Sequence, residues 1–153
     1  MRTFITSLVL SVAITTQAQT FRQIEPGVYL LAAGQEDAHT PLRYKEPVAK
    51  QLKDMPTTDN PFAKEGVHIE VNARGCVVDI PLAADENIYG FGLQMGSFVQ
   101  NNKKKRPLVN DHPLKDLGYT HAPQPFYISN KGYAVLINTA RYTTFYIGTN
   151  RKN

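Results

Sequence analysis

The amino-acid sequence predicts an all-β protein, an antiparallel β-sandwich. Three observations favour this fold class: several short apolar segments are separated by turn residues, two pairs of these segments have the spacing of hairpins, and helical periodicity is almost absent. One short helix is predicted at residues 48–55, between Pro47 and Pro56. Short strands without a helix of normal length are typical of a sandwich.

The first 18 residues are predicted to be an export signal. Arg2 supplies a positive charge, residues 4–14 form an uncharged apolar run, and Thr16 and Ala18 are the small residues of a cleavage site. The run is too short to span a bilayer, and a buried first strand is the alternative. We therefore expect one mature domain, residues 19–153, that is secreted or periplasmic and is not held in a membrane.

The first strands are predicted from short apolar segments. Residues 27–31 form one such run, and residues 67–71 alternate apolar and polar side chains, which is the period of a half-buried strand. A turn cluster at 72–75 and a second apolar run at 76–80 complete a predicted hairpin. Cys76 is the only cysteine, and its place in an apolar strand favours a buried thiol over a free one.

The second hairpin has the clearer signal. Residues 126–129 and 133–138 are rich in β-branched and aromatic side chains, and Gly132 supplies the positive φ that closes the loop between them. A further strand is predicted at 143–147. Upstream, two glycines flank Phe91, which indicates a strand whose backbone is closely approached by another segment.

Charge excludes little. The formal net charge of +4 is modest, and the only basic run is 103–106. Such a run could bind nucleic acid or an acidic polysaccharide, but it is short and has no aromatic neighbours for base stacking. We interpret it as a solvated loop and expect no nucleic-acid partner.

Two long segments, 35–64 and 96–120, lack regular structure in the sequence pattern, and loops of this length are often functional. The second contains Asn110, Asp111 and His112, whose short polar side chains suit sugar hydroxyls. Aromatic side chains that could stack on a pyranose ring are Phe98, Tyr119 and Tyr127.

Other chemistries find little support. The sequence has no Gly-x-Ser-x-Gly elbow, and His112 and His121 match no metal-ligand spacing. A carboxylate pair for glycosidic-bond chemistry would have to come from Glu86, Asp111 and Asp116, and no pattern places two of them together. We expect neither a metal nor a cofactor.

Three motifs in order carry a family resemblance: E-N-I-Y-G-F-G-L-Q from Glu86, N-D-H-P from Asn110, and P-F-Y-I-S-N-K-G-Y-A-V-L-I-N-T from Pro125. The resemblance covers about residues 66–149. This region resembles the N-terminal β-sandwich of glycoside hydrolase family 31, which includes α-glucosidases and α-xylosidases.

The resemblance implies a galactose mutarotase-like β-sandwich that precedes a catalytic (β/α)8 barrel. It also implies that a long loop of the sandwich reaches over the active-site mouth of the barrel. There Asp111 would help to bind an α-linked oligosaccharide or glycoside, and Asn110 and His121 are the neighbouring substrate-binding candidates. The motif glycines would be structural.

Two features depart from the family pattern. The hairpin has Gly-Tyr-Ala where many members have Gly-Tyr-Gly, and the sequence ends at Asn153, before a barrel and before further sandwich strands. We therefore expect a truncated domain of an exported α-glycosidase that carries no catalytic residue and has no hydrolytic activity alone. The alternative is a free-standing carbohydrate-binding or structural module.

Overall fold

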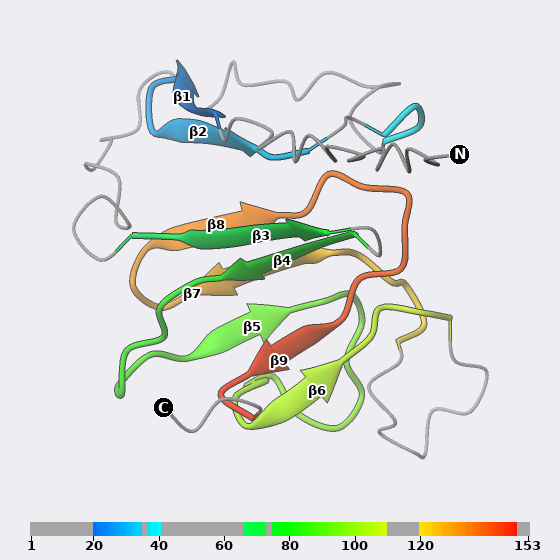
Figure 1. Cartoon of the computed structure of the whole chain (residues 1–153). Coiled ribbons are helices and arrows are strands. Elements are labelled where there is room, and N and C mark those ends of the chain that lie inside the picture. Colours follow the sequence, from blue (N-terminus) through cyan, green and yellow to red (C-terminus); the bar gives the residue numbers. More distant parts are fainter. Residues whose placement is uncertain (1–19, 35–36, 41–65, 73–74, 110–119, 150–153) are drawn as a thin grey trace, which may run out of the picture.

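A computed structural model describes residues 20–34, 37–40, 66–72, 75–109 and 120–149. These residues form nine strands and no helix, and every sheet is antiparallel (Figure 1). The predicted all-β class is confirmed. The predicted signal at 1–18 and the predicted helix at 48–55 lie outside the described residues. No helix capable of crossing a membrane occurs in the described ranges.

Two of the sheets are simple hairpins. β1 (Thr20–Glu25) pairs with β2 (Val28–Ala32) around Gly27, whose φ is 71°. β3 (His68–Asn72) pairs with β4 (Gly75–Asp79), which confirms the hairpin predicted there. β1 was not predicted, because its residues alternate too weakly in polarity to indicate a strand.

The central sheet has three strands in the order β5-β7-β8. β5 (Ile88–Gly90) lies along one edge of β7 (Phe126–Ser129), and β8 (Tyr133–Leu136) lies along the other. The β7–β8 pair is the second predicted hairpin, and Gly132 in its loop has a φ of 85°, as expected. This sheet therefore joins two motifs that are more than 30 residues apart in the sequence.

The last sheet corrects the interpretation of the basic run. β6 (Lys103–Lys105) pairs with β9 (Phe145–Ile147), so these lysines form a strand and the prediction of a solvated loop was wrong. Lys105 is only 1% exposed, and its Nζ donates to Oε1 of Gln94 at 2.8 Å. Three consecutive lysines do not indicate a strand in the sequence, and this one forms because β9 provides its backbone hydrogen-bond partners.

The core lies between the central sheet and the β6–β9 sheet. Its buried members are Ile88, Phe91, Tyr127 and Ile147, and Phe145 packs against them. The ring centroids of Phe91 and Phe145 are 4.7 Å apart with a 54° interplanar angle, a tilted contact that aromatic pairs favour. Phe91 therefore connects the two sheets.

Cys76 is exposed, and the prediction of a buried thiol was wrong. In the described residues β4 pairs only with β3. On the face that carries Cys76, Val71 and Val78 are exposed, and only Ile69 of the same face is buried. Strand periodicity reveals which side chains share a face but not whether a second layer covers that face.

The close approach predicted around Phe91 is confirmed. A Cβ on Gly90 would lie 2.7 Å from the carbonyl oxygen of Phe126, and a Cβ on Gly92 would overlap the carbonyl oxygen of Ala122. Both glycines have positive φ, 124° and 96°. The segment of residues 122–127 can thus pack directly against the backbone of Gly90 and Gly92, because neither residue has a side chain.

We predict that Gly92→Ala destabilises the protein, by about 1–3 kcal/mol, because alanine must adopt a positive φ and displace the Ala122 carbonyl. Urea unfolding followed by circular dichroism measures the effect. Gly96→Ala is the matched control, since nothing lies within 4 Å of its added Cβ. Equal stability of the two variants would contradict this account of the close approach.

Candidate functional site

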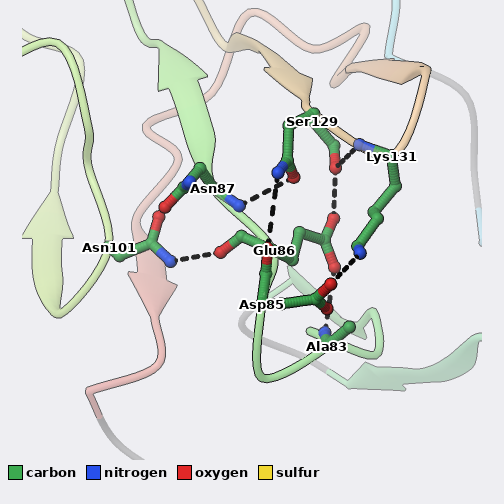
Figure 2. A network of polar contacts seen from close by, with 8 residues as sticks. Ala83, Asp85, Glu86, Asn87, Asn101, Ser129 and Lys131 are labelled. Carbon is green, nitrogen blue, oxygen red and sulfur yellow. Dashed lines mark hydrogen bonds and ion pairs between the residues drawn. The ribbon is translucent and has the colours of Figure 1, made fainter.

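A buried carboxylate stands at the entrance to β5 (Figure 2). Glu86 is 4% exposed, and its Oε1 accepts hydrogen bonds from the hydroxyls of Ser129 and Tyr133, each at 2.5 Å. Its Oε2 accepts the backbone N–H of Ala83 at 2.9 Å. Both oxygens are therefore engaged by donors, two of which come from the β7–β8 hairpin.

These donors set the ionisation of the group. Burial by itself raises the pKa of the Glu86 carboxyl, but the hydrogen bonds from Ser129, Tyr133 and Ala83 outweigh it, and the pKa lies below its ordinary value. Burial, together with the hydrogen bond to Glu86, raises the pKa of the Tyr133 hydroxyl, which stays a donor. The carboxylate is therefore held as an anion whose two oxygens accept hydrogen bonds from neighbouring segments.

The side chains of Asn101, labelled in Figure 2, and of Asn130 extend the network to neighbouring segments. Asn101 donates from Nδ2 to the backbone oxygen of Glu86 at 2.6 Å and accepts the N–H of Ile88 at 2.9 Å. Asn130 accepts the N–H of Asn87 through Oδ1 at 2.9 Å. Each side-chain amide bonds to backbone groups at the start of β5, as a neighbouring strand would. These bonds fix the position of β5 relative to the segments of Asn101 and Asn130.

An exposed ion pair borders this network. Lys131 Nζ lies 2.5 Å from Oδ2 of Asp85, with side chains 38% and 78% exposed. The hydrogen bond from Lys131 lowers the pKa of the Asp85 carboxyl. Solvent screening makes such a pair a small contribution to stability.

A second polar cluster connects the segment after β2 with the segment after β8. Asp37 accepts the hydroxyl of Thr139, and its Oδ1 lies 2.8 Å from Nε of Arg141. These two hydrogen bonds, that of Thr139 first, lower the pKa of Asp37. Sequence reasoning missed this cluster, because more than 100 residues separate its members and no motif links them.

Of the predicted sugar-binding residues, Asn110 and Asp111 lie outside the described residues and stay predictions. The structure does place the residues that flank their segment. Val109 and Thr120 form an isolated parallel bridge, and the N–H of Thr120 donates to the oxygen of Leu108 at 2.9 Å. The two chain ends that border residues 110–119 are therefore held together.

Thr120 fixes this junction to the rest of the fold. Its side chain is 3% exposed, and its hydroxyl donates to the backbone oxygen of Leu93 at 2.5 Å, just past Gly92. His121, the third predicted residue, follows directly and is exposed. The residue types around Thr120 give no sequence signal for this role, since a single threonine is common in any loop.

The aromatic residues that were predicted to stack on a sugar ring differ in their exposure to solvent. Tyr127 is 8% exposed and belongs to the core, so its prediction as a stacking residue was wrong. Phe98 is 87% exposed, and its backbone oxygen accepts a hydrogen bond from the buried side chain of Gln100 at 3.1 Å. Tyr119 lies outside the described residues. Phe98 therefore remains available to an apolar ligand face.

The described part of the chain contains no group of three or more His, Cys, Asp or Glu side chains that could hold a metal ion. Its polar clusters are internally paired. Beside the Val109–Thr120 bridge, His121 is exposed.

Comparison with protein families places the chain in a known family. The family model described as the glycosyl hydrolase 31 N-terminal galactose mutarotase-like domain matches residues 14–145, most of the chain. A search of curated proteins found no match.

We predict that Glu86→Gln costs about 1–3 kcal/mol near neutral pH, because the NH2 of the new amide must face either the N–H of Ala83 or the two hydroxyls that donate to the carboxylate. Since the folded-state pKa of Glu86 lies below its ordinary 4.5, the stability from its ionised form is full above that pH and is lost as pH falls through the lowered value. The gap between wild type and variant should thus narrow in acid.

Urea unfolding across this pH range provides the measurement. Glu70→Gln, which changes an exposed acid on β3, is the matched control and should have little effect at any pH. A gap between wild type and Glu86→Gln that stays constant in acid would show that the carboxylate charge does not contribute.

Proposed function

The chain belongs to the glycosyl hydrolase 31 N-terminal galactose mutarotase-like family, and we propose that it is the carbohydrate-associated domain of an exported α-glycosidase. In this role the segment with Asn110 and Asp111, followed by His121, contacts an α-linked glycoside. The sugar-cleaving acids belong to a (β/α)8 barrel, which needs about 250 residues and so lies outside these 153.

The observation that carries this proposal is the junction at Val109 and Thr120. A loop that contacts a ligand must return to a rigid base, because freely moving ends would lose conformational entropy on binding. Here both ends of the 110–119 segment meet at one bridge, and Thr120 is tied to Leu93 in the segment after β5. The two ends of the segment are thus tied to Leu93, three residues beyond β5.

The chemistry of the three residues suits a sugar. The Asp111 carboxylate accepts hydrogen bonds from vicinal hydroxyls, the Asn110 amide both donates and accepts, and the His121 imidazole can do either. Phe98 adds an exposed aromatic ring. None of these groups requires a metal or cofactor for binding.

We predict that the purified chain binds maltooligosaccharides weakly and does not hydrolyse aryl α-glucosides or α-xylosides. Asp111→Ala should weaken binding about tenfold or more, since hydrogen bonds to charged groups contribute about 1.5–3 kcal/mol. Titration followed by amide chemical shifts measures the affinity. Glu25→Gln, an exposed acid on β1, is the control and should bind as wild type does.

Two results would contradict the proposal. Turnover by the chain that Asp111→Ala abolishes would place catalysis in this domain. Unchanged amide shifts on addition of oligosaccharide, from a chain that unfolds cooperatively, would instead favour a structural module without a ligand.

A further inference from the structure

The outer face of the β6–β9 sheet combines cations and aromatic rings. Lys104 and Tyr146 are cross-strand partners, and Nζ of Lys104 lies 5.3 Å from the centroid of the Tyr146 ring. Beside them, Cζ of Arg106 lies 5.4 Å from the centroid of the Tyr142 ring. We call these four residues the cation–aromatic face. The sequence concealed it, because the two tyrosines come from a segment almost 40 residues away.

Strand alternation explains why only part of the basic run reaches this face. Lys105 is buried opposite Phe145, and Lys103 pairs with the buried Ile147, so both lie on the inner side. Lys104 points outward with Tyr146, and Arg106 is exposed beyond the end of the strand. Of the basic run, Lys104 and Arg106 are thus exposed, Lys103 is half-buried and Lys105 is buried.

Both outward charges are without a carboxylate partner in the part of the chain that the structure describes. Elsewhere the exposed cations Lys131 and Arg141 pair with Asp85 and Asp37. Neither Lys104 nor Arg106 forms an ion pair within the ranges that the structure describes, and the segments around them, 101–109 and 140–149, contain no acidic residue. The electrostatic complement of this face is therefore an anion.

We propose that the cation–aromatic face binds an anionic polysaccharide through its carboxylate groups. An Arg guanidinium matches a carboxylate with two parallel donors, and a Lys ammonium adds a point charge. The contacts with Tyr142 and Tyr146 restrict both cations before binding, which lowers the entropy that binding must remove. The tyrosines are 78% and 48% exposed, so their hydroxyls can reach sugar hydroxyls.

The same geometry disfavours nucleic acid. Base stacking needs an open ring face, and here a cation already lies over one face of each ring, 5.3 and 5.4 Å from the centroids. Two outward charges also give a weak field for a phosphate backbone, where affinity grows with the number of phosphates neutralised. A polyuronate, with carboxylates spaced along a hydroxyl-rich chain, fits better.

This inference goes beyond the proposed function, because it concerns a different ligand and different side chains. The face lies on β6 and β9 and on the residues beside them, Arg106 and Tyr142, whereas the predicted glycoside contacts border the Val109–Thr120 bridge. Failure of the full chain to bind neutral maltooligosaccharides would leave the cation–aromatic face untouched, and loss of polyuronate binding would leave the glycoside proposal untouched.

The test measures binding of the full chain to polygalacturonate, with fully methyl-esterified polygalacturonate as the neutral ligand of the same backbone. We expect binding to the charged polymer only, weakened by salt. Lys104→Gln with Arg106→Gln should reduce affinity about tenfold. Tyr142→Leu should also reduce it, which a purely electrostatic surface would not show.

Arg22→Gln is the matched control, since Arg22 is an exposed cation on β1, at the opposite end of the molecule from β6 and β9 (Figure 1). It should bind as wild type does, and thermal unfolding should show that every variant folds. Equal binding to the methyl-esterified polymer, an equal loss in Arg22→Gln, or tighter binding to single-stranded DNA than to polygalacturonate would each overturn the proposal.

Discussion

The fold depends on one buried charge at the entrance to β5. An ionised carboxylate away from water is costly unless donors replace its hydration. Glu86 obtains those donors from Ser129 and Tyr133, 43 and 47 residues later in the sequence. The carboxylate is therefore satisfied only when β5 and the β7–β8 hairpin are in register. That register places Phe91 in the core, and the core joins the central sheet to β6–β9.

Local patterns in the sequence were sufficient to predict the two hairpins and the glycines at turns and close approaches. Alternation and turn residues predicted residues 67–80 and 126–138, because a hairpin is specified by neighbours along the chain. They failed where a distant partner decides the outcome. β6 forms because β9 pairs with it and because Gln94 accepts a hydrogen bond from the buried ammonium of Lys105. The prediction that Cys76 is buried failed for a similar reason, since the exposure of a strand residue depends on whether another layer covers its sheet.

The sequence was sufficient to select residue types that suit a sugar, but not to show where those residues lie in the fold. Asn110, Asp111 and His121 were singled out by residue type and by resemblance, and their roles remain predictions. Sequence could not separate Phe98 from Tyr127, because an aromatic residue beside a strand suits both a core and a ligand surface. Nor could it identify Thr120, whose importance comes from a hydrogen bond to Leu93, 27 residues earlier in the sequence.

A single strand supports both surfaces that we associate with sugars. On its inner side Lys105 is anchored by Gln94, and this anchor fixes which lysine faces outward. On its outer side Lys104 lies over Tyr146. The chain then passes Arg106 and reaches the Val109–Thr120 bridge within a few residues. Moving the register of β6 by one residue would bury Lys104, expose Lys105 and shift the base of the 110–119 segment, so the inner hydrogen bond constrains both outer surfaces together.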